Sequence, residues 1–298
     1  MKNKLYSALV EMGIACRPDV PLSAHSSFRI GGVGELGVFP KSTEELSACV
    51  SAVRAEGKKL YVIGNGSNIL FGDGSIDGVF IFMSGLSSVR TVGVNILAEA
   101  GASLSAISTA AAESGLSGIE FAKGIPGSLG GAVFMNAGAY GGQMSDVIVS
   151  SVALNTESGE LTTLTDHGFS YRDSIYMRRE ELVCVSAKMK LTEGRTDEIK
   201  EKMREFTVNR REKQPLEYPS AGSYFKRPEG HFAGKLIEDC GLKGLRVGGA
   251  CVSEKHAGFI INLGGATAED VFALEERIRD TVYKQFGVTL EREVRVIR

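Results

Sequence analysis

Seven glycines are concentrated in nineteen residues of this 298-residue chain, in the stretch GIPGSLGGAVFMNAGAYGG from Gly124 to Gly142. Glycine lets backbone amides approach a ligand closely, and it permits turns with positive φ that direct successive N–H groups at one anion. A run of tight turns or a barrel corner is the alternative interpretation. Pro126 stiffens the segment and Asn136 adds a side-chain amide, which favours an ordered loop that binds a phosphate group.

The composition bounds the class of protein. Its 34 Lys and Arg residues nearly balance 36 Asp and Glu residues, so the net charge of −2 argues against a nucleic-acid partner. The five cysteines form no C-x-x-C pair and cannot all be paired, which favours reduced thiols and the cytoplasm. No apolar run reaches 18 residues and no signal peptide is recognisable, so we expect no membrane insertion.

Helical and strand patterns mix without a regular βαβ order, which predicts an α+β protein of two or three domains. Apolar spacing predicts helices at the start of the chain, after Ser42 and after Thr267. An Ala-rich segment predicts a helix over Leu104–Ser114, and a charged segment that ends before Pro215 predicts one over Thr196–Lys213. Expected strands are Lys59–Ile63, Val79–Met83, Ile96–Ala100, Val147–Asn155, Leu161–Leu164, Leu182–Leu191 and Val288–Ile297.

Two glycine motifs differ in their context. Gly32, Gly34 and Gly37 match G-x-G-x-x-G formally, but the following residues are extended, which argues against a Rossmann loop. The Gly64–Asn68 loop instead follows an expected strand directly and can point several donors at a diphosphate. Walker A, H-E-x-x-H and G-x-S-x-G motifs are absent from the sequence, and we expect no metal.

The last expected strand places Glu291, Glu293 and Arg295 on one face by its period of two, although a solvated charged face is an equally simple reading. Ser223 could be an ordinary turn serine. Basic residues flank Ser223 in the sequence and form a candidate site for a diphosphate, and the alternative is that they are a solvated helix end followed by a turn. These residues are Arg210, Arg211, Lys213, Lys226 and Arg227.

Eight ordered segments are similar to the UDP-N-acetylenolpyruvoylglucosamine reductase family, the flavoenzymes also called UDP-N-acetylmuramate dehydrogenases. They are Ser26–Gly32, Gly64–Leu70, Gly124–Gly142, Tyr171–Ser174, Ala221–Pro228, Ala233–Gly244, Gly248–Asn262 and Gly287–Ile297. The resemblance implies a two-subdomain FAD-binding region of the vanillyl-alcohol oxidase type and a smaller α+β substrate-binding domain. The implied boundaries are 1–83 and 84–206 for the FAD-binding subdomains, the second joined by a C-terminal strand at 284–298, and 207–283 for the substrate domain.

The resemblance also implies the residues of the site. FAD, held non-covalently, is expected to contact Arg29, Ile30, Gly64, Asn65, Gly66, Ser67, Asn68, Ile125, Pro126, Gly127, Ser128, Gly131, Asn136, Ala137 and Gly138. The expected catalytic residues are Ser223, Arg172 and Glu293, and the expected substrate contacts are Tyr140, Arg210, Lys213, Lys226, Arg227 and Arg295.

The implied reaction reduces the enolpyruvyl ether of UDP-N-acetylglucosamine enolpyruvate with NADPH, giving UDP-N-acetylmuramate for peptidoglycan synthesis, and so serves cell-wall biogenesis, cell shape and cell division. Hydride leaves flavin N5, Arg172 stabilises the substrate carboxylate, and Ser223 donates the proton. Glu293 either donates a hydrogen bond as a protonated acid or orients Arg172 or a water.

Two departures and two alternatives remain. Many family members have Asn where Arg227 stands, and the short spacing from Arg172 to Ser223 resembles the subtype without an inserted tyrosine loop. An oxidase on the same scaffold would pass electrons to oxygen, but the Gly64–Asn68 loop lacks the histidine that often attaches flavin in such enzymes. A binder of flavin or nucleotide sugar without catalysis is the other alternative.

Overall fold

The computed structural model describes residues 4–298, which divide into two compact units. Unit 1 contains the residues up to Asp19, Glu35–Asn65 and Asp77–Arg210, and unit 2 contains Val20–Gly34, Gly66–Ile76 and Arg211–Arg298. The boundary falls within β1, β2, β5 and α6, and the chain also changes unit between Asn65 and Gly66.

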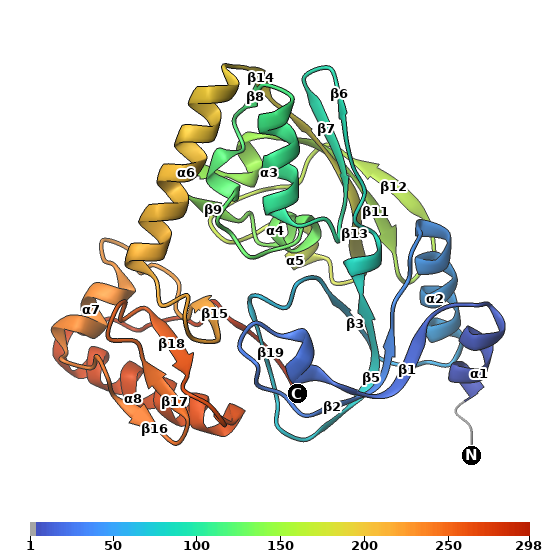
Figure 1. Cartoon of the computed structure of the whole chain (residues 1–298). Helices are drawn as coiled ribbons and strands as arrows, with labels where there is room; N and C mark the ends of the chain where they lie inside the picture. Colours follow the sequence, from blue (N-terminus) through green and yellow to red (C-terminus); the bar gives the residue numbers. More distant parts are fainter. Residues whose placement is uncertain (1–3) are drawn as a thin grey trace. The chain divides into compact units, whose positions relative to one another are not determined.

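Unit 1 combines helices with two larger sheets (Figure 1). Its helices are α1 (Lys4–Glu11), α2 (Thr43–Ala55), α3 (Leu104–Glu113), α4 (Leu129–Phe134), α5 (Ile175–Arg178) and α6 (Thr196–Lys213). Its strands are β1 (Cys16–Pro21), β2 (Val33–Val38), β3 (Leu60–Ile63), β5 (Ser75–Phe82), β6 (Val89–Val92), β7 (Asn95–Glu99), β8 (Leu116–Ser117), β9 (Gly138–Ala139), β10 (Gly142–Gln143), β11 (Ile148–Asn155), β12 (Leu161–Leu164), β13 (Leu182–Lys190) and β14 (Thr192–Glu193).

The sheets of unit 1 share one hydrophobic core. A four-stranded sheet has the order β1-β2-β5-β3, and an antiparallel five-stranded sheet has the order β12-β11-β13-β7-β6. Helices α3 and α4 lie against the five-stranded sheet (Figure 1). The core extends from Leu5 and Leu9 of α1 to Met189 of β13, and each fully buried aliphatic side chain contributes about 1.5–3 kcal/mol.

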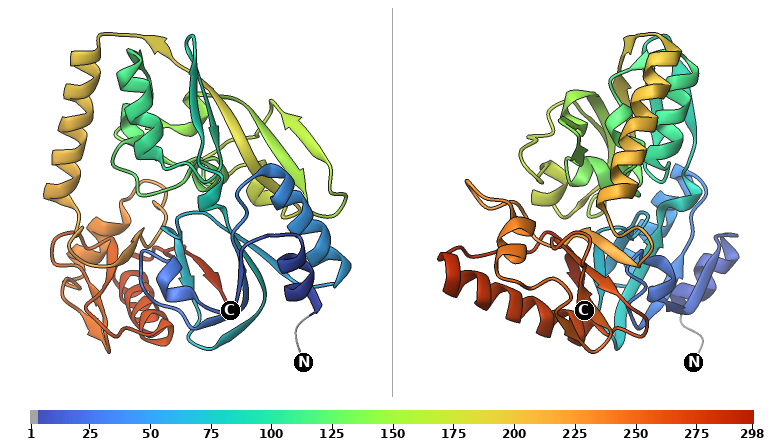
Figure 2. Two further views of the ribbon diagram at one scale, coloured as in Figure 1. Left: turned by 45° about the vertical axis from the view of Figure 1, so that its right-hand side comes forward. Right: turned by 60° about the vertical axis from the view of Figure 1, so that its left-hand side comes forward.

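Unit 2 is a smaller α+β unit with a core of its own. Its elements are β4 (Ile69–Phe71), β15 (Ser220–Ser223), α7 (Ala233–Asp239), β16 (Arg246–Val247), β17 (Ala250–Val252), β18 (Phe259–Asn262), α8 (Ala268–Phe286) and β19 (Arg295–Ile297). Its antiparallel sheet has the order β15-β18-β17-β16, and α8 packs against β16 and β17 (Figure 2). Thr267 and Asp270 cap α8 reciprocally, as the sequence predicts.

The expected helices are all present, and Thr196–Lys213 has the predicted bounds. The C-terminal strand is the main correction: residues 284–286 are the last turn of α8, and only Arg295–Ile297 form a strand, which pairs in parallel with β4 of unit 2. The apolar stripe carries α8 to Phe286, and Gly287 ends it in the left-handed conformation at φ 69°. The predicted functional boundaries at 83, 206 and 283 stay predictions.

Gly34 and Gly37 lie within β2, and the backbone after Gly32 is extended, which confirms that no phosphate-binding turn forms there. All five cysteines are free thiols. Among residues 4–298, no helix has both the length and the apolar run needed to cross a membrane. Within the same residues, no three His, Cys, Asp or Glu side chains are arranged to hold a metal ion.

Candidate functional site

Strained backbone coincides with the predicted site. Among the described residues, positive φ occurs at five residues other than glycine, namely Asp19, Arg29, Asn136, Tyr140 and Arg172. This conformation costs a residue with a Cβ roughly 1–2 kcal/mol and persists where the surroundings enforce it, often at functional sites. Four of these five residues belong to the set that the sequence predicts for cofactor, substrate or catalysis, which supports that set.

In unit 1 the predicted phosphate loop lies beside Gly64. Ser128 precedes α4 and is buried, and its hydroxyl oxygen has no hydrogen-bond partner in the described structure. A Cβ built on Gly64 would lie 2.2 Å from that oxygen. The Asn65 side chain donates to the carbonyl of Pro126 at 3.5 Å, so the two predicted cofactor segments contact each other.

Arg172 lies in a turn that buried polar groups attach to the same glycine-rich segment. Ser170 and Asp173 exchange backbone hydrogen bonds, and Arg172 takes up the φ of 55° between them. Ser174 donates to the carbonyl of Phe134 at 2.8 Å, and Asn136 Nδ2 donates to the carbonyl of Ser170 at 3.0 Å. The turn is therefore fixed on both sides of Arg172.

The Asn136 side chain is hydrogen-bonded within unit 1. Its Nδ2 donates to Gln143 Oε1 and to Ser170, and its Oδ1 accepts from the backbone N–H of Ser145 at 2.9 Å. Both amide hydrogens are thus engaged inside unit 1. The side chain therefore joins the loop to Gln143, Ser145 and Ser170, and the cofactor contact of Asn136 stays a prediction.

Tyr140 and Arg210 lie close together in unit 1. Tyr140 and Gly141 connect β9 to β10 with φ of 52° and 84°, as a type I′ hairpin turn requires. The Tyr140 ring stacks on Phe206 of α6 with centroids 4.5 Å apart. The Arg210 side chain packs against Gly124, and its burial lowers the pKa of the guanidinium despite the nearby Tyr140. Arg210 makes no ion pair with residues 4–298, which suits it to bind an anion.

In unit 2 the other predicted cofactor contacts form a second connected group. Gly66 has φ 59°, and a Cβ there would lie 2.0 Å from the carbonyl oxygen of His25. The backbone N–H of Ser27 donates to the carbonyl of Gly66 at 3.1 Å. Arg29 is exposed in the left-handed conformation beside buried Ile30, and Ser67 is half-buried.

Ser223 and Glu293 belong to neighbouring backbone segments of unit 2. The N–H of Glu293 donates to the carbonyl of Tyr224 at 2.9 Å, and the N–H of Lys226 donates to the carbonyl of Glu291 at 2.8 Å. Ser223 is exposed and follows a bulge at which Gly222 has φ 78°. Such bulges redirect a side chain next to active sites.

Asn68 extends this group. Its side-chain amide donates to the carbonyl of Glu293 at 3.2 Å, and its carbonyl accepts from the N–H of Arg295 at 3.0 Å. The other predicted substrate contacts of unit 2 are more exposed. Lys226 pairs with Glu291 at 3.3 Å, the Arg227 guanidinium lies 4.2 Å from the centre of the Phe232 ring, and Lys213 is exposed at the end of α6.

The sequence reasoning missed Phe206 and Glu275. Phe206 is the stacking partner of Tyr140 and looked like one apolar residue on a charged helix. Glu275 is buried on α8, one helical turn from Val271 and beside Leu274. An acidic residue within a predicted apolar stripe was the available signal.

Two protein-family models match the chain. An FAD-binding domain matches residues 35–165, and the C-terminal domain of UDP-N-acetylenolpyruvoylglucosamine reductase matches residues 214–297. A glucooligosaccharide oxidase from Acremonium strictum aligns at a TM-score of 0.51 over 97% of this chain and 60% of its own, with 10% identity, and so supports the fold alone. The fold is an FAD-binding region of the vanillyl-alcohol oxidase type with the reductase C-terminal domain.

The residues of unit 1 fit FAD by their own geometry. The buried Ser128 hydroxyl lacks a partner, and the missing Cβ of Gly64 is what lets that hydroxyl lie against the Gly64 backbone. A phosphate oxygen accepting from Ser128 would satisfy that hydroxyl, since buried polar groups are almost always hydrogen-bonded. The charge balance also fits, because Arg210 and Lys123 provide cations near the same segment.

Full-length relatives agree with both family models. The reductase of Clostridium beijerinckii is 48% identical over 295 residues, covering 99% of this chain and 96% of its own length. That of Syntrophomonas wolfei is 49% identical over 280 residues, covering 93% of each chain. The crystal structure of the Thermus caldophilus enzyme aligns with a TM-score of 0.81 and 34% identity, covering 96% of this chain and 99% of that one. The chain belongs to the UDP-N-acetylenolpyruvoylglucosamine reductase family.

Proposed function

We propose that the chain reduces the enolpyruvyl ether of UDP-N-acetylglucosamine enolpyruvate to UDP-N-acetylmuramate, with FAD as cofactor and NADPH as reductant. The reaction would supply peptidoglycan synthesis in the cytoplasm. Family membership supports the reductase activity and the use of FAD. Bound FAD would supply the reducing equivalents that NADPH provides, and the residues of this chain would hold the substrate and control its protons.

Cofactor binding is assigned to both connected groups. In unit 1, Gly64, Asn65, the Ile125–Ser128 segment, Gly131 and the Asn136–Gly138 backbone would hold FAD. In unit 2, Arg29, Ile30, Gly66, Ser67 and Asn68 would do so. Glycines that a Cβ would bring into collision, and a buried hydroxyl without a partner, support this assignment.

Arg172 would bind the substrate carboxylate. An enolpyruvyl carboxylate accepts further electron density poorly, because negative charge accumulates on it during reduction. A guanidinium stabilises that charge through charge-assisted hydrogen bonds, and a turn fixed in advance avoids reorganisation during the reaction. The strained φ of Arg172 and the fixed neighbours on both sides support this role.

Ser223 would donate the proton that completes the reduction of the substrate. Glu293 would either donate a hydrogen bond as a protonated acid or orient Arg172 or a water. A hydroxyl is a weak acid, so it needs hydrogen-bond reach of about 2.6–3.2 Å and a neighbour that stabilises the alkoxide. The single observation that carries this proposal is the backbone pairing of residues 224–226 with residues 291–293. It holds the Ser223 and Glu293 segments side by side through two backbone hydrogen bonds, Glu293 N–H to the Tyr224 carbonyl and Lys226 N–H to the Glu291 carbonyl.

The substrate diphosphate would be bound by basic residues around these segments. Arg210 and Tyr140 are assigned in unit 1, and Lys213, Lys226, Arg227 and Arg295 in unit 2. The absence of an ion pair at half-buried Arg210 among the described residues supports its assignment most directly. The cation–π contact of Arg227 holds its side chain against Phe232, which supports a positioned charge.

The test separates the two half-reactions of the FAD-loaded protein under anaerobic conditions. In Ser223→Ala, NADPH should bleach the flavin at the normal rate, whereas UDP-N-acetylglucosamine enolpyruvate should restore its colour at least a hundredfold more slowly. Thr281→Ala removes a hydroxyl elsewhere in unit 2 and is the matched control. Normal recovery of colour in Ser223→Ala would remove Ser223 from the reaction.

A further inference from the structure

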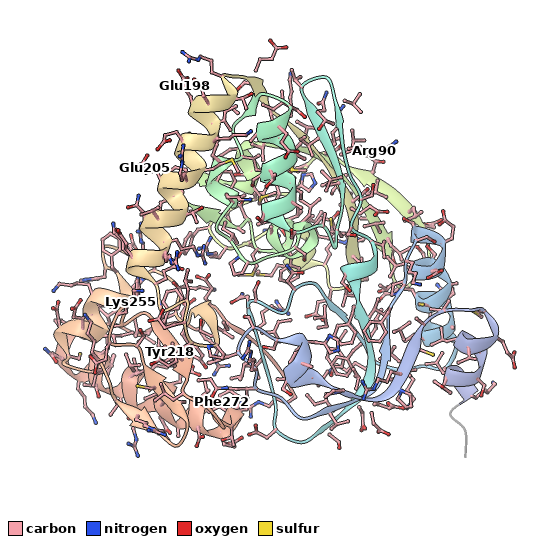
Figure 3. All side chains as sticks on the ribbon, in the orientation of Figure 1. Arg90, Glu198, Glu205, Tyr218, Lys255 and Phe272 are labelled. Atoms are coloured by element: carbon pink, nitrogen blue, oxygen red, sulfur yellow. The ribbon has the colours of Figure 1, made fainter. Side chains whose placement is uncertain are left out.

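We propose that Glu275 of α8 is a positioning residue that holds the segments carrying Ser223 and Glu293 in one register. The proposal rests on the proposed function, because it assigns Glu275 a task only through those two residues. All the residues concerned lie in unit 2. Figure 3 labels Phe272, which lies one turn before Glu275 on α8. The centre of the Phe272 ring is 5.5 Å from the Arg292 guanidinium.

One carboxylate oxygen of Glu275 contacts both segments. Its Oε2 accepts from the hydroxyl of Tyr224 at 2.8 Å and from Arg292 Nε at 2.8 Å, and Arg292 Nη2 lies 2.6 Å away. Tyr224 is the residue after Ser223, and Arg292 is the residue before Glu293. A single buried group therefore binds the immediate neighbour of each proposed catalytic residue.

The backbone alone specifies this register weakly. Within residues 4–298 the two segments share a single isolated bridge, Phe225 with Arg292, and strand β19 begins later, at Arg295. The bulge before Ser223 adds irregularity on the other edge, where Ser223 pairs with Phe259. A slip of one residue turns every side chain of an extended segment to the opposite face, so such a short pairing needs a further constraint.

The burial of Glu275 argues for such a constraint over simple stabilisation. The side chain is only 3% exposed and adjoins Leu274 and Ile278, which are fully buried. Its Oε1 has no hydrogen bond in the described structure, and Arg279 Nη1 is 3.7 Å away. An apolar side chain often replaces a buried ion pair without loss of stability, and buried ionic groups can instead specify one arrangement.

The test removes the anchor while preserving the packing. The triple variant Tyr224→Phe, Glu275→Leu, Arg292→Leu removes both hydrogen-bond partners of Glu275 together with it, and the remaining partner, Arg279, is exposed to water. Glu275→Gln keeps the side-chain shape without the charge. Glu276→Leu changes the exposed neighbour on the same helix and is the matched control. Each protein is loaded with FAD, and flavin bleaching by NADPH and recovery on adding UDP-N-acetylglucosamine enolpyruvate are followed separately by stopped-flow absorbance.

We expect the triple variant to be reduced by NADPH within twofold of the normal rate and reoxidised by substrate at least tenfold more slowly. Glu275→Gln should fall between the triple variant and the starting protein, and it supplies the same comparison if the triple variant does not retain FAD. Recovery within twofold of normal, or equal slowing of both half-reactions, would overturn the positioning role.

Direct variants separate this proposal from the proposed function. If Ser223→Ala and Glu293→Gln block recovery but the Glu275 variants do not, only the positioning role fails. If Ser223→Ala and Glu293→Gln both recover normally, the assignment of catalysis fails and the positioning role fails with it.

Discussion

The turn that carries Arg172 and the segments that carry Ser223 and Glu293 are held by different kinds of interaction. The buried contacts of the turn in unit 1 are neutral, since Asn136 and Ser174 donate to backbone carbonyls, and its ion pair, Arg178 with Asp173, is partly exposed. A buried carboxylate and a guanidinium hold the segments in unit 2, where Glu275 binds Arg292. A neutral hydrogen bond contributes about 1 kcal/mol, whereas removing one partner of a buried ion pair costs several.

A second neutral network supports the region beyond the Arg172 turn. The hydroxyl of buried Ser151 lies 2.7 Å from His167 Nε2 and 2.7 Å from the Tyr176 hydroxyl. Burial lowers the pKa of His167 and raises that of Tyr176, so both stay uncharged near neutral pH. The comparison teaches that the buried contacts of the Arg172 turn in unit 1 are neutral and its ion pair, Arg178 with Asp173, is partly exposed, whereas unit 2 uses a buried charge to align two separate segments.

The largest expected effect comes from the loop whose first half lies in unit 1 and second half in unit 2. Gly66→Ala places a Cβ 2.0 Å from a backbone carbonyl oxygen at φ 59°, and we expect it to lower the free energy of unfolding by about 3–5 kcal/mol. In Gly64→Ala the new Cβ meets the Ser128 hydroxyl, which can rotate away. We therefore expect the free energy of unfolding to fall by only about 1–2 kcal/mol, with the main effect on FAD binding. Urea unfolding measures the stability of the two variants, and flavin titration measures their affinity for FAD. Equal losses of stability in Gly66→Ala and Gly64→Ala would contradict the predicted difference between them.

The next effect breaks the charged support of unit 2. Arg292→Leu alone leaves Glu275 buried without its guanidinium, and we expect a loss of about 2–3 kcal/mol, reduced from the fully buried case because Arg292 is partly exposed. Urea unfolding measures the loss, and the apolar triple variant should recover most of it. A loss below about 0.5 kcal/mol would show that the ion pair is solvated.

The neutral support of unit 1 is tested at Asn136. Asn136→Ala removes the side-chain hydrogen bonds but keeps a Cβ at φ 42°, and we expect the free energy of unfolding to fall by about 2 kcal/mol. Asn136→Gly also removes the bonds but tolerates the backbone, so it should be about 1 kcal/mol more stable than the alanine variant. Thermal unfolding of the pair separates strain from bonding, and identical stabilities would argue against strain.

The smallest effect concerns pH. Because the pKa of His167 is lowered below 6.5 in the folded protein, the unfolded chain binds protons first, and stability falls as pH decreases below about 6.5. The titration of one histidine changes the free energy of unfolding by at most about 1.4 kcal/mol per pH unit. Unfolding measured from pH 7.5 to 5.5 should show a shallower slope in His167→Gln than in the starting protein, and an unchanged slope in His167→Gln would exclude the effect.

The sequence predicted local features better than connections between distant segments. The end of α6 follows from the nearby Pro215, and the capped start of α8 follows from Thr267 and Asp270, signals that act over a few positions. The short length of β19 could not be predicted, because alternation in residues 288–297 does not show which of them find a partner strand. Asn136 was recognised as important, but only the fold shows that its amide bonds to Ser170 and Ser145.

The most direct test of the account is the stoichiometry of one anaerobic turnover by the FAD-loaded protein. One equivalent of NADPH should bleach the flavin, and one equivalent of UDP-N-acetylglucosamine enolpyruvate should restore its colour with formation of one equivalent of UDP-N-acetylmuramate. A flavin that stays bleached with this substrate and regains its colour only when oxygen is admitted would contradict a reductase and indicate an oxidase.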